Sequence, residues 1–525
     1  MLLWIEFGLV VVALCLAFIV PSLGSNLFSS LERIFGSLAR RKKLSVLVVG
    51  LAALGARAAV LPILPVPQPH IDDEFSHLLL ADTLMHGRLA NPVHPMLTHF
   101  ETLFVNMQPT YASMYPPAQG MLLAAGRLIA GRAFVGVWLS VGVMCAAICW
   151  MLQGWLPAEW ALLGGMLMVM RFGVFSYWAN SYWGGTVAAT GGALVLGALP
   201  RILRFERVRD ALILGIGLAI LANSRPYEGL VLSLPVGVAL VIWLMKKKKA
   251  ELRLPLGRVV APLSMIVALT AVGMGFYFWR VTGNPLVMPQ SLNRNTYAVS
   301  PYFLWQSARP IPAYHHESLR HFYVDEELTN YRDSRTLGGM IFLEVLKIPK
   351  FWLFYLGPVF TLPLALAILI LPKGWKWSGL SWEARFLFWT AAIGCAGLAL
   401  ELFYFVHYSA PMICLVFAIV MLAMREAREW KWRGKPVGLF LTRSVPVICF
   451  FVLLVRVIAA APIENYLRSK SEWPAKWFSS IPIDTGRARV ESQLAAAPGN
   501  HLVIVLDNAD PTYVYDWVHN EADID

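Results

Sequence analysis

Charged residues are scarce in this chain: Asp, Glu, Lys and Arg together make up 14% of its 525 residues, whereas 58% are hydrophobic. This balance excludes an ordinary soluble domain and is typical of a polytopic membrane protein. Cysteine is also rare, and all six cysteines fall within apolar runs. They predict small buried hydrophobic side chains rather than outer-loop disulfides, and no Cys/His spacing suggests a zinc site.

The sequence has no nucleic-acid-binding motif to accompany its net charge of +12. Most of that charge comes from Lys and Arg clusters between apolar runs, which hold loops in the cytoplasm and attract anionic membrane lipid. We therefore expect membrane lipid, and no nucleic acid, as a partner. The first apolar run lacks the basic start and the A-x-A cleavage pattern of a signal peptide, so we expect it to remain as a span.

Apolar runs long enough to cross a hydrocarbon core of about 30 Å occur twelve times. They are 2–23, 44–65, 133–155, 160–178, 183–199, 211–222, 230–245, 259–279, 351–371, 386–406, 408–424 and 444–461. The expected fold class is an all-α polytopic membrane protein with about 12 transmembrane helices. Basic residues collect in every second connection, which leaves the N-terminus, residues 66–132, residues 280–350 and the C-terminal tail outside the cytoplasm.

The chain becomes polar beyond residue 461. The pattern predicts a short helix over 485–497 and a buried strand over 501–506. Because one helix and one strand cannot bury a core, we expect residues 462–525 to be the start of a small extracytoplasmic α/β domain that is incomplete. Residues 1–461 would form the transmembrane domain.

Ionisable residues within the expected spans share one depth, near the outer side. They are Arg57, Arg171, Glu401 and Arg456 in outer halves of spans, and Arg225, Glu228 and His407 at outer turns. Scattered structural ion pairs have no reason to share a depth, so this pattern predicts a polar cavity that opens to the outer face. A transporter would instead need a site near the midplane with access from both sides, and the sequence shows no internal repeat.

Three consecutive acids, Asp72, Asp73 and Glu74, follow an apolar run and begin a segment with helical spacing over 72–86. We expect an amphipathic helix on the membrane surface. A helix N-terminus explains one acid as a cap but not three. The chemical alternative is that Asp72 or Asp73 is a general base, while Asp73 and Glu74 hold a divalent cation such as Mg or Mn or bind a substrate hydroxyl. His77 shares a helix face with Asp73.

Two other outer segments carry candidate binding residues. The short turn 223–229 places Arg225, Tyr227 and Glu228 together, which suits the binding of a phosphate or a sugar. Arg88 and Arg127 could also bind phosphate, although long basic side chains commonly reach to the membrane interface instead.

The chain resembles the class C (GT-C) membrane glycosyltransferases, the superfamily of the protein O-mannosyltransferases and the lipid A aminoarabinose transferases. The resemblance rests on the acids Asp72 to Glu74 early in the first outer loop, on Tyr115, Pro116 and Pro117 before the next apolar segment, and on a late His-Tyr-x-x-Pro stretch. That stretch is formed by His407, Tyr408 and Pro411.

The resemblance implies an inverting transfer of a sugar from a polyprenyl-phosphate donor to a hydroxyl or amine of a lipid, glycan or protein acceptor. The reaction would take place at the outer face of a bacterial inner membrane. Asp72 or Asp73 would be the base, and Arg225, with Arg88 or Arg127, would neutralise the phosphate. Relatives often carry a basic residue just after the proline pair, whereas this chain has Gln119. This difference shifts the phosphate contact to the arginines.

Two alternatives remain open from the sequence. A polysaccharide polymerase or O-antigen ligase would use a large late outer loop, here residues 280–350 with His315, His316 and His321. A lipid or solute transporter would not be an enzyme. Nothing resembles a nucleotide-binding fold, which favours a lipid-linked donor over a nucleotide sugar.

Overall fold

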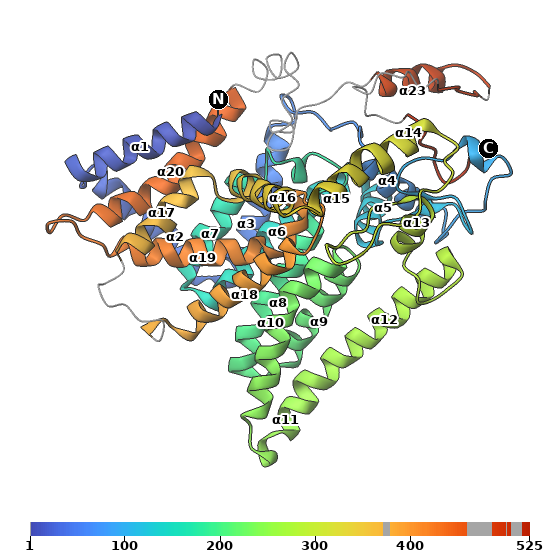
Figure 1. The fold of residues 1–525 in the computed structure, drawn as a ribbon. Coiled ribbons are helices and arrows are strands. Elements are labelled where there is room, and N and C mark those ends of the chain that lie inside the picture. Colours follow the sequence, from blue (N-terminus) through green and yellow to red (C-terminus); the bar gives the residue numbers. More distant parts are fainter. Residues whose placement is uncertain (1, 371–378, 459–485, 500, 506–516, 525) are drawn as a thin grey trace.

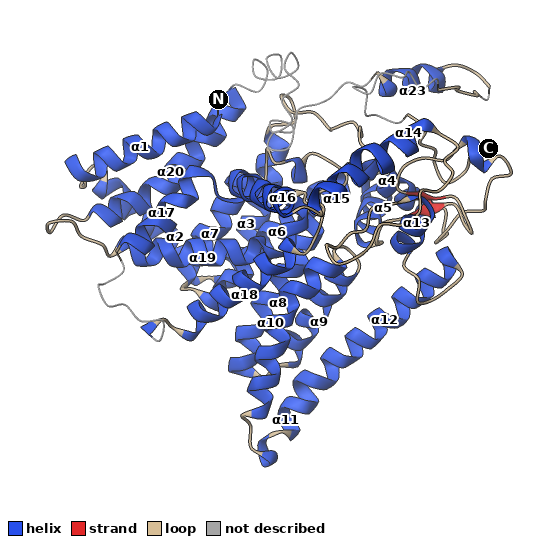
Figure 2. Ribbon diagram, in the orientation of Figure 1, coloured by secondary structure: helices blue, strands red, loops and turns tan. Residues whose placement is uncertain are grey.

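The computed structural model describes residues 2–370, 379–458, 486–499, 501–505 and 517–524. Those residues are mostly helical, as Figure 2 shows. Within them the only strands are β1 (Val105–Asn106) and β2 (Ala112–Ser113), which pair antiparallel as a small hairpin. The expected all-α class is confirmed for the membrane part of the chain.

The α-helices run through the whole described chain (Figure 1). They are α1 (Leu2–Ile19), α2 (Ser25–Arg40), α3 (Lys42–Ala59), α4 (Asp72–Met85), α5 (Ala118–Ala130), α6 (Ala133–Trp155), α7 (Ala158–Phe172), α8 (Thr186–Phe205), α9 (Val208–Ala222), α10 (Pro226–Met245), α11 (Arg253–Pro255), α12 (Ala261–Thr282), α13 (Pro289–Tyr297), α14 (Glu317–Arg320), α15 (Leu328–Ser334), α16 (Leu337–Phe351), α17 (Gly357–Leu369), α18 (Trp382–Ala399), α19 (Ile413–Arg428), α20 (Val437–Ile458) and α23 (Arg487–Ala496). Short 3-10 turns are η1 (Leu97–His99), η2 (Tyr177–Ala179), η3 (Lys249–Glu251) and η8 (Val406–Met412), and π turns are η4 (Leu256–Val260), η5 (His321–Glu327) and η6 (Trp352–Leu356).

Eight helical segments of the described chain are long and apolar enough to cross a membrane, and they make this an integral membrane protein. They are Leu2–Ile19, Ala133–Trp155, Thr186–Phe205, Pro226–Met245, Lys249–Thr282, Leu337–Leu369, Val406–Arg428 and Val437–Ile458. Three of these segments join neighbouring elements end to end, such as α16, η6 and α17.

The other four expected spans are present as helices but are shorter or more charged. Helices α7 and α9 have 15 residues each, about 22 Å, which is less than the hydrocarbon core. Helix α3 has 18 residues but includes Lys42, Lys43 and Arg57, and α18 carries Glu383 and Arg385 near its start. The expected number of twelve spans is therefore not confirmed.

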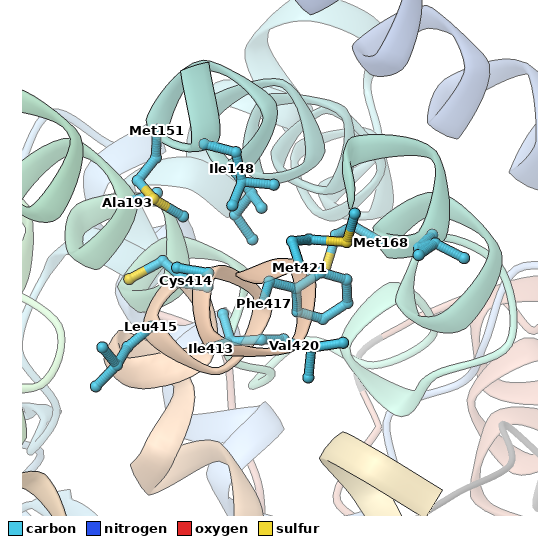
Figure 3. Packing of buried hydrophobic residues seen from close by; sticks show 14 of the residues in the cluster. Ile148, Met151, Met168, Ala193, Ile413, Cys414, Leu415, Phe417, Val420 and Met421 are labelled. Carbon is cyan, nitrogen blue, oxygen red and sulfur yellow. The ribbon is translucent and has the colours of Figure 1, made fainter. Parts of the chain in front are cut away.

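The main core lies where α6, α7, α8 and α19 meet. Figure 3 shows Ile148 of α6 facing Phe417 and Met421 of α19, with Met168 of α7 beside Met421 and Met151 of α6 beside Ala193 of α8. Small residues let these helices approach closely: a Cβ atom on Gly192 of α8 would overlap the carbonyl group of Pro411. All six cysteines are unpaired, with four buried and two, Cys15 and Cys395, exposed.

Helix α4 is confirmed at the expected place, but it does not have one buried and one exposed face as an amphipathic helix would. Eight of its 14 residues are buried, on several faces, because it packs against α5 and the β-hairpin. The amphipathic helix is α2, in an expected inner connection. It exposes Leu27, Ile34 and Phe35, while its Glu32 is held by Arg428 and Arg443.

The C-terminal tail departs from the expected α/β unit. Helix α23 is confirmed, but residues 501–505 are not a strand, and Leu502 and Ile504 are exposed. Residues 517–524 bury Ala522 against Leu79 and Tyr111 instead, because α4 and the segment around the β-hairpin already supply an apolar surface. The expected boundary at 461–462 lies outside the described residues.

Candidate functional site

A cavity of about 250 Å³ lies where α4 meets the starts of α8 and α10 and two later loops. Its lining is mixed, with polar and aromatic side chains among a few apolar ones. The lining residues are His77, Tyr115, Pro116, Gln119, Trp183, Gly184, Gly185, Val187, Ala188, Ser224, Arg225, Pro226, Tyr227, Glu228, Met288, Gln290, Ser291, Tyr302, Phe303, Glu401, Phe403 and Tyr408. We call this the central cavity.

Prolines fix the turns that present the key side chains to the central cavity. Arg225 has a non-helical backbone (φ −134°, ψ 79°) directly before Pro226, the first residue of α10. Tyr115 likewise precedes Pro116 and Pro117, after which α5 begins. The functional side chains therefore stand on short turns at the ends of rigid helices.

Arg225 is the only Lys or Arg among the residues that line the central cavity. Its guanidinium group lies 4.2 Å from the ring centroid of Tyr408 and 3.6 Å from a carboxylate oxygen of Glu228. These two contacts hold the guanidinium group in place. They leave some of its five N–H groups available to a ligand. The remaining donors suit an anionic ligand group.

Asp73 does not line the central cavity itself but is hydrogen-bonded to a residue that does. The hydroxyl group of Tyr115, which lines the cavity, donates to its carboxylate. Burial raises the pKa of Asp73 to about 7, against the opposing effect of the Tyr115 hydrogen bond. A carboxylate with a pKa near neutrality is suited to accept and release protons.

His77 stacks on the ring of Tyr115, with ring centroids 4.5 Å apart. Burial, together with the positive charge of Arg225, lowers the pKa of His77 to about 3. The imidazole is therefore neutral near pH 7, and it supports the position of Tyr115 without adding charge to the cavity.

Asp72 faces the C-terminal tail rather than the central cavity. Its carboxylate lies 2.9 Å from Nε2 of His519, and the His519 ring stacks on Phe75 at 4.2 Å. Burial also raises the pKa of Asp72 to about 7. Asp72 and Asp73 thus have similar proton affinity but different partners.

Glu74 lies in a structural position and not at the central cavity, so its expected role in metal or substrate binding receives no support from the geometry. It is fully buried, and its two oxygens accept the backbone N–H groups of His70 at 2.9 Å and of Tyr182 at 2.8 Å. With Asp73 bonded to Tyr115, this pair does not present a set of ligands for a cation. Across the described ranges, no three His, Cys, Asp or Glu side chains gather as metal ligands would.

Arg88 and Arg127 do not line the central cavity, contrary to the role expected for them. Arg88 pairs with Asp523 of the tail at 2.7 Å, and Arg127 pairs with Asp82 of α4 at 2.6 Å. Arg127 lines a second, open cavity of about 730 Å³ on another side of α4.

Only some of the ionisable residues that were expected at one depth lie at the same site. Arg225, Glu228 and Glu401 line the central cavity, and His407 packs edge-on against its Trp183 at 4.5 Å. The others have separate partners. Arg57 donates to the carbonyl groups of Leu64 and Pro65, Arg171 pairs with Glu6, and Arg456 lines a small separate cavity beside Arg171.

The late loop contributes residues that the sequence did not single out. Gln290, Ser291, Tyr302 and Phe303 line the cavity, and Gln290 donates to the hydroxyl group of Tyr302 at 2.8 Å. The Tyr- and Asn-rich composition of residues 280–350 was the signal, but it did not distinguish these positions from their neighbours. The histidines of this loop have other partners: His315 contacts Glu101, His316 contacts the carbonyl group of Thr98, and His321 contacts Asp325.

No family model matches the chain, and no curated protein matches it. Among solved structures it is similar to the oligosaccharyltransferase of Archaeoglobus fulgidus in complex with Zn and sulfate, with 11% identity and a TM-score of 0.46 over 82% of this chain and 56% of the other. The apo form of that protein gives 13% identity and a TM-score of 0.39 over 87% and 58%. A structure of the Archaeoglobus fulgidus enzyme with an inhibitory peptide and a dolichol-phosphate gives 10% and 0.36 over 83% and 58%.

The chain thus spans a little over half the length of these solved proteins. Similarity at this level does not define a family. The function is therefore argued from the geometry of the central cavity.

Proposed function

We propose that the protein is a membrane glycosyltransferase of the GT-C type that transfers a sugar from a polyprenyl-phosphate donor to an acceptor hydroxyl or amine. Asp73 is the base and Arg225 the principal phosphate contact. The observation that carries the proposal is the placement of both groups at one cavity. A carboxylate with a pKa of about 7 lies one hydrogen bond behind the wall, and the same cavity contains a single guanidinium group.

The reaction needs a base for the acceptor and a counter-charge for the leaving group. Because Tyr115 lies between Asp73 and the cavity, the acceptor proton passes to the Tyr115 oxygen as Tyr115 gives its own proton to Asp73. The acceptor atom forms a bond to the anomeric carbon while the bond from that carbon to the phosphate oxygen breaks. Attack opposite the phosphate inverts the configuration.

The leaving group is polyprenyl phosphate, which carries the electron pair of the broken bond. Arg225 stabilises the negative charge that develops on its oxygens. The high pKa of Tyr115, raised by burial and by the neighbouring Asp73 carboxylate, keeps its hydroxyl protonated. Tyr115 therefore relays a proton, and Asp73 stores it.

Our proposal places the central cavity at the outer face of a bacterial inner membrane. In support, its lining residues come from α4, the turns before α5, α8 and α10, and the late loops, which the Lys and Arg pattern assigns to one side. The acceptor is a lipid, glycan or protein that reaches this side.

The alternatives receive less support from the geometry. A polymerase or ligase that uses His315, His316 or His321 would need them at the cavity, and they lie elsewhere. A transporter would need access from both sides, whereas the lining residues all belong to segments assigned to one side.

The test is sugar transfer by the purified protein in lipid nanodiscs, with radiolabelled polyprenyl-phosphate sugars and a membrane extract as the source of acceptors. We expect Asp73→Asn to lower the rate by about 100- to 10,000-fold, and Asp72→Asn to lower it by less than about tenfold. Full activity of Asp73→Asn, or no release of polyprenyl phosphate by the wild type, would overturn the proposal.

A further inference from the structure

Glu401 is a buried acid on the wall of the central cavity that the proposed reaction does not use. It is 6% exposed, and its Oε2 atom is buried without a donor within the described part of the chain. An unpartnered buried carboxylate oxygen destabilises the folded protein, so it calls for a specific explanation.

Lys347 donates no hydrogen bond to this carboxylate, although its charge attracts it. All three donors of Lys347 are in use: Nζ donates to a carboxylate oxygen of Glu344 at 2.6 Å, to the carbonyl group of Leu398 at 2.9 Å, and to the backbone carbonyl group of Glu401 itself at 2.7 Å. Lys347 thus holds the backbone carbonyl group of Glu401 in place and makes no hydrogen bond to its side chain.

The neighbouring acid, Glu228, has two stabilising features that Glu401 lacks: a helix N-terminus and an ion pair. Glu228 lies in the first turn of α10, where the helix N-terminus favours negative charge, and it pairs with Arg225 at 3.6 Å. Within the described part of the chain, Glu401 has neither a helix N-terminus nor an ion pair. Glu228 repels its carboxylate, whereas the more distant charges of Arg225 and Lys347 attract it. Arg225 is therefore engaged by Glu228, and the hydrogen-bonding capacity of the Glu401 side chain is left unused among the described residues.

Aromatic rings line the same cavity as Glu401. Phe303, Tyr227 and Phe403 line the same cavity, and the rings of Tyr227 and Phe303 lie 4.7 Å apart. The backbone of Phe303 also bridges to that of Glu401. A rigid acceptor beside apolar ring faces is a common arrangement for a ring-shaped ligand with polar substituents.

We propose that Glu401 determines which sugar the central cavity accepts, by accepting a hydrogen bond from one hydroxyl or ammonium substituent of the transferred ring. This inference rests on the proposed function, since it takes the sugar to be part of a polyprenyl-phosphate donor. A site built to hydrogen-bond a substituent rejects the analogue that lacks it, because the buried acceptor is then left unpaired.

The experiment measures equilibrium binding of donors to the full-length protein in nanodiscs. The probes are the polyprenyl phosphates of glucose, of its mono-deoxy analogues and of the matching amino sugars. The variants are Glu401→Gln, which keeps an acceptor without charge, and Glu401→Leu, which removes it. Glu317→Gln is the control, because Glu317 is an exposed carboxylate on α14 that does not line the cavity.

We expect the wild type to bind one deoxy analogue about 10- to 100-fold more weakly than its parent, and Glu401→Leu to lose that preference. If the substituent is a hydroxyl, Glu401→Gln keeps part of the preference. If it is an ammonium group, Glu401→Gln loses nearly all of it, because the charge is lost as well.

A preference that is unchanged in Glu401→Leu, with normal binding of the parent donor, would overturn the role of Glu401 and leave the proposed function in place. Failure of the wild type to bind any of the donors would overturn the proposed function, and this inference with it. The two failures are therefore distinguishable.

Discussion

Tyr115 joins Asp73 to the central cavity: its hydroxyl group donates to the carboxylate, while its ring lies 4.5 Å from that of His77. The acid that attracts attention in the sequence thus acts through a tyrosine 42 positions later in the chain. This relationship makes specific predictions for pH dependence.

Removal of the Tyr115 hydroxyl group should change the pH profile of the reaction as well as its rate. Asp73 must be deprotonated to accept a proton, so activity should rise with pH around the pKa of about 7. The hydrogen bond from Tyr115 lowers that pKa, so Tyr115→Phe should move the acidic limb to higher pH. We also expect a rate loss of about 10- to 1,000-fold, since the relay is lost.

The measurement is kcat/KM between pH 5 and 9 for the wild type and Tyr115→Phe. Tyr111→Phe is the matched control, because the Tyr111 hydroxyl donates to the carbonyl group of Asn520 and does not line the central cavity. An acidic limb that stays in place, or moves to lower pH, would contradict the link between Tyr115 and Asp73.

Replacement of Arg225 should weaken donor binding even when positive charge is kept. Arg225→Lys retains the charge but loses the planar fork that stacks on Tyr408 at 4.2 Å, so we expect a loss of about tenfold in donor affinity. Arg225→Ala should lose about 100-fold or more, because Glu228 is then left unpaired as well. Donor binding should be measured in nanodiscs at several salt concentrations.

Arg127→Lys provides the comparison for this experiment, since Arg127 pairs with Asp82 outside the central cavity. Equal losses for the Arg127 and Arg225 variants would show that the phosphate does not depend on the central cavity.

Glu74→Gln should destabilise the protein rather than remove a metal ion. Both oxygens of Glu74 accept backbone N–H groups in a fully buried position, and an amide would turn a donor toward one of them. We expect a loss of about 2–3 kcal/mol in stability and a lower midpoint of thermal unfolding. A stable Glu74→Gln variant that regains activity with added Mn²⁺ would support metal binding by Glu74 instead.

His519→Ala should loosen the outer end of α4 without changing the proton affinity that governs the reaction. The substitution removes the stacking on Phe75 and the contact with Asp72. We expect protease sensitivity near α4 to increase and the rate to fall about two- to tenfold, with the acidic limb of the pH profile in place. His501→Ala is the control, because His501 is exposed and contacts only the carbonyl group of Ala497 among the described residues. A shift of the acidic limb in His519→Ala would indicate that Asp72 is the base.

Local patterns in the sequence were sufficient for much of this architecture. Helical spacing predicted α4 over 72–86, and the structure has it over Asp72–Met85. Charged and aromatic residues in short turns predicted Arg225, Tyr227 and Glu228 at a cavity, and they line it with His77, Tyr115 and Tyr408. These features depend on near neighbours in the chain.

The positions of other candidate residues depend on distant partners, which the sequence does not reveal. Glu74 looks like its two neighbours until Tyr182, 108 positions away, supplies a backbone N–H group. Arg88 and Arg127 look available for phosphate until Asp523 and Asp82 pair with them. A shared depth in the membrane does not specify position around the bundle, so Arg57 and Arg171 could not be separated from Arg225 by sequence alone.

The contact between Asp72 and His519 joins residues 447 positions apart. At about 5–20 residues per second, the ribosome adds His519 roughly 20–90 s after Asp72. During that interval the outer end of α4 lacks its tail contacts, although the spans around it are already being inserted. The contacts at the acidic end of α4 therefore form only after the tail has been synthesised, later than the helices that surround the candidate site.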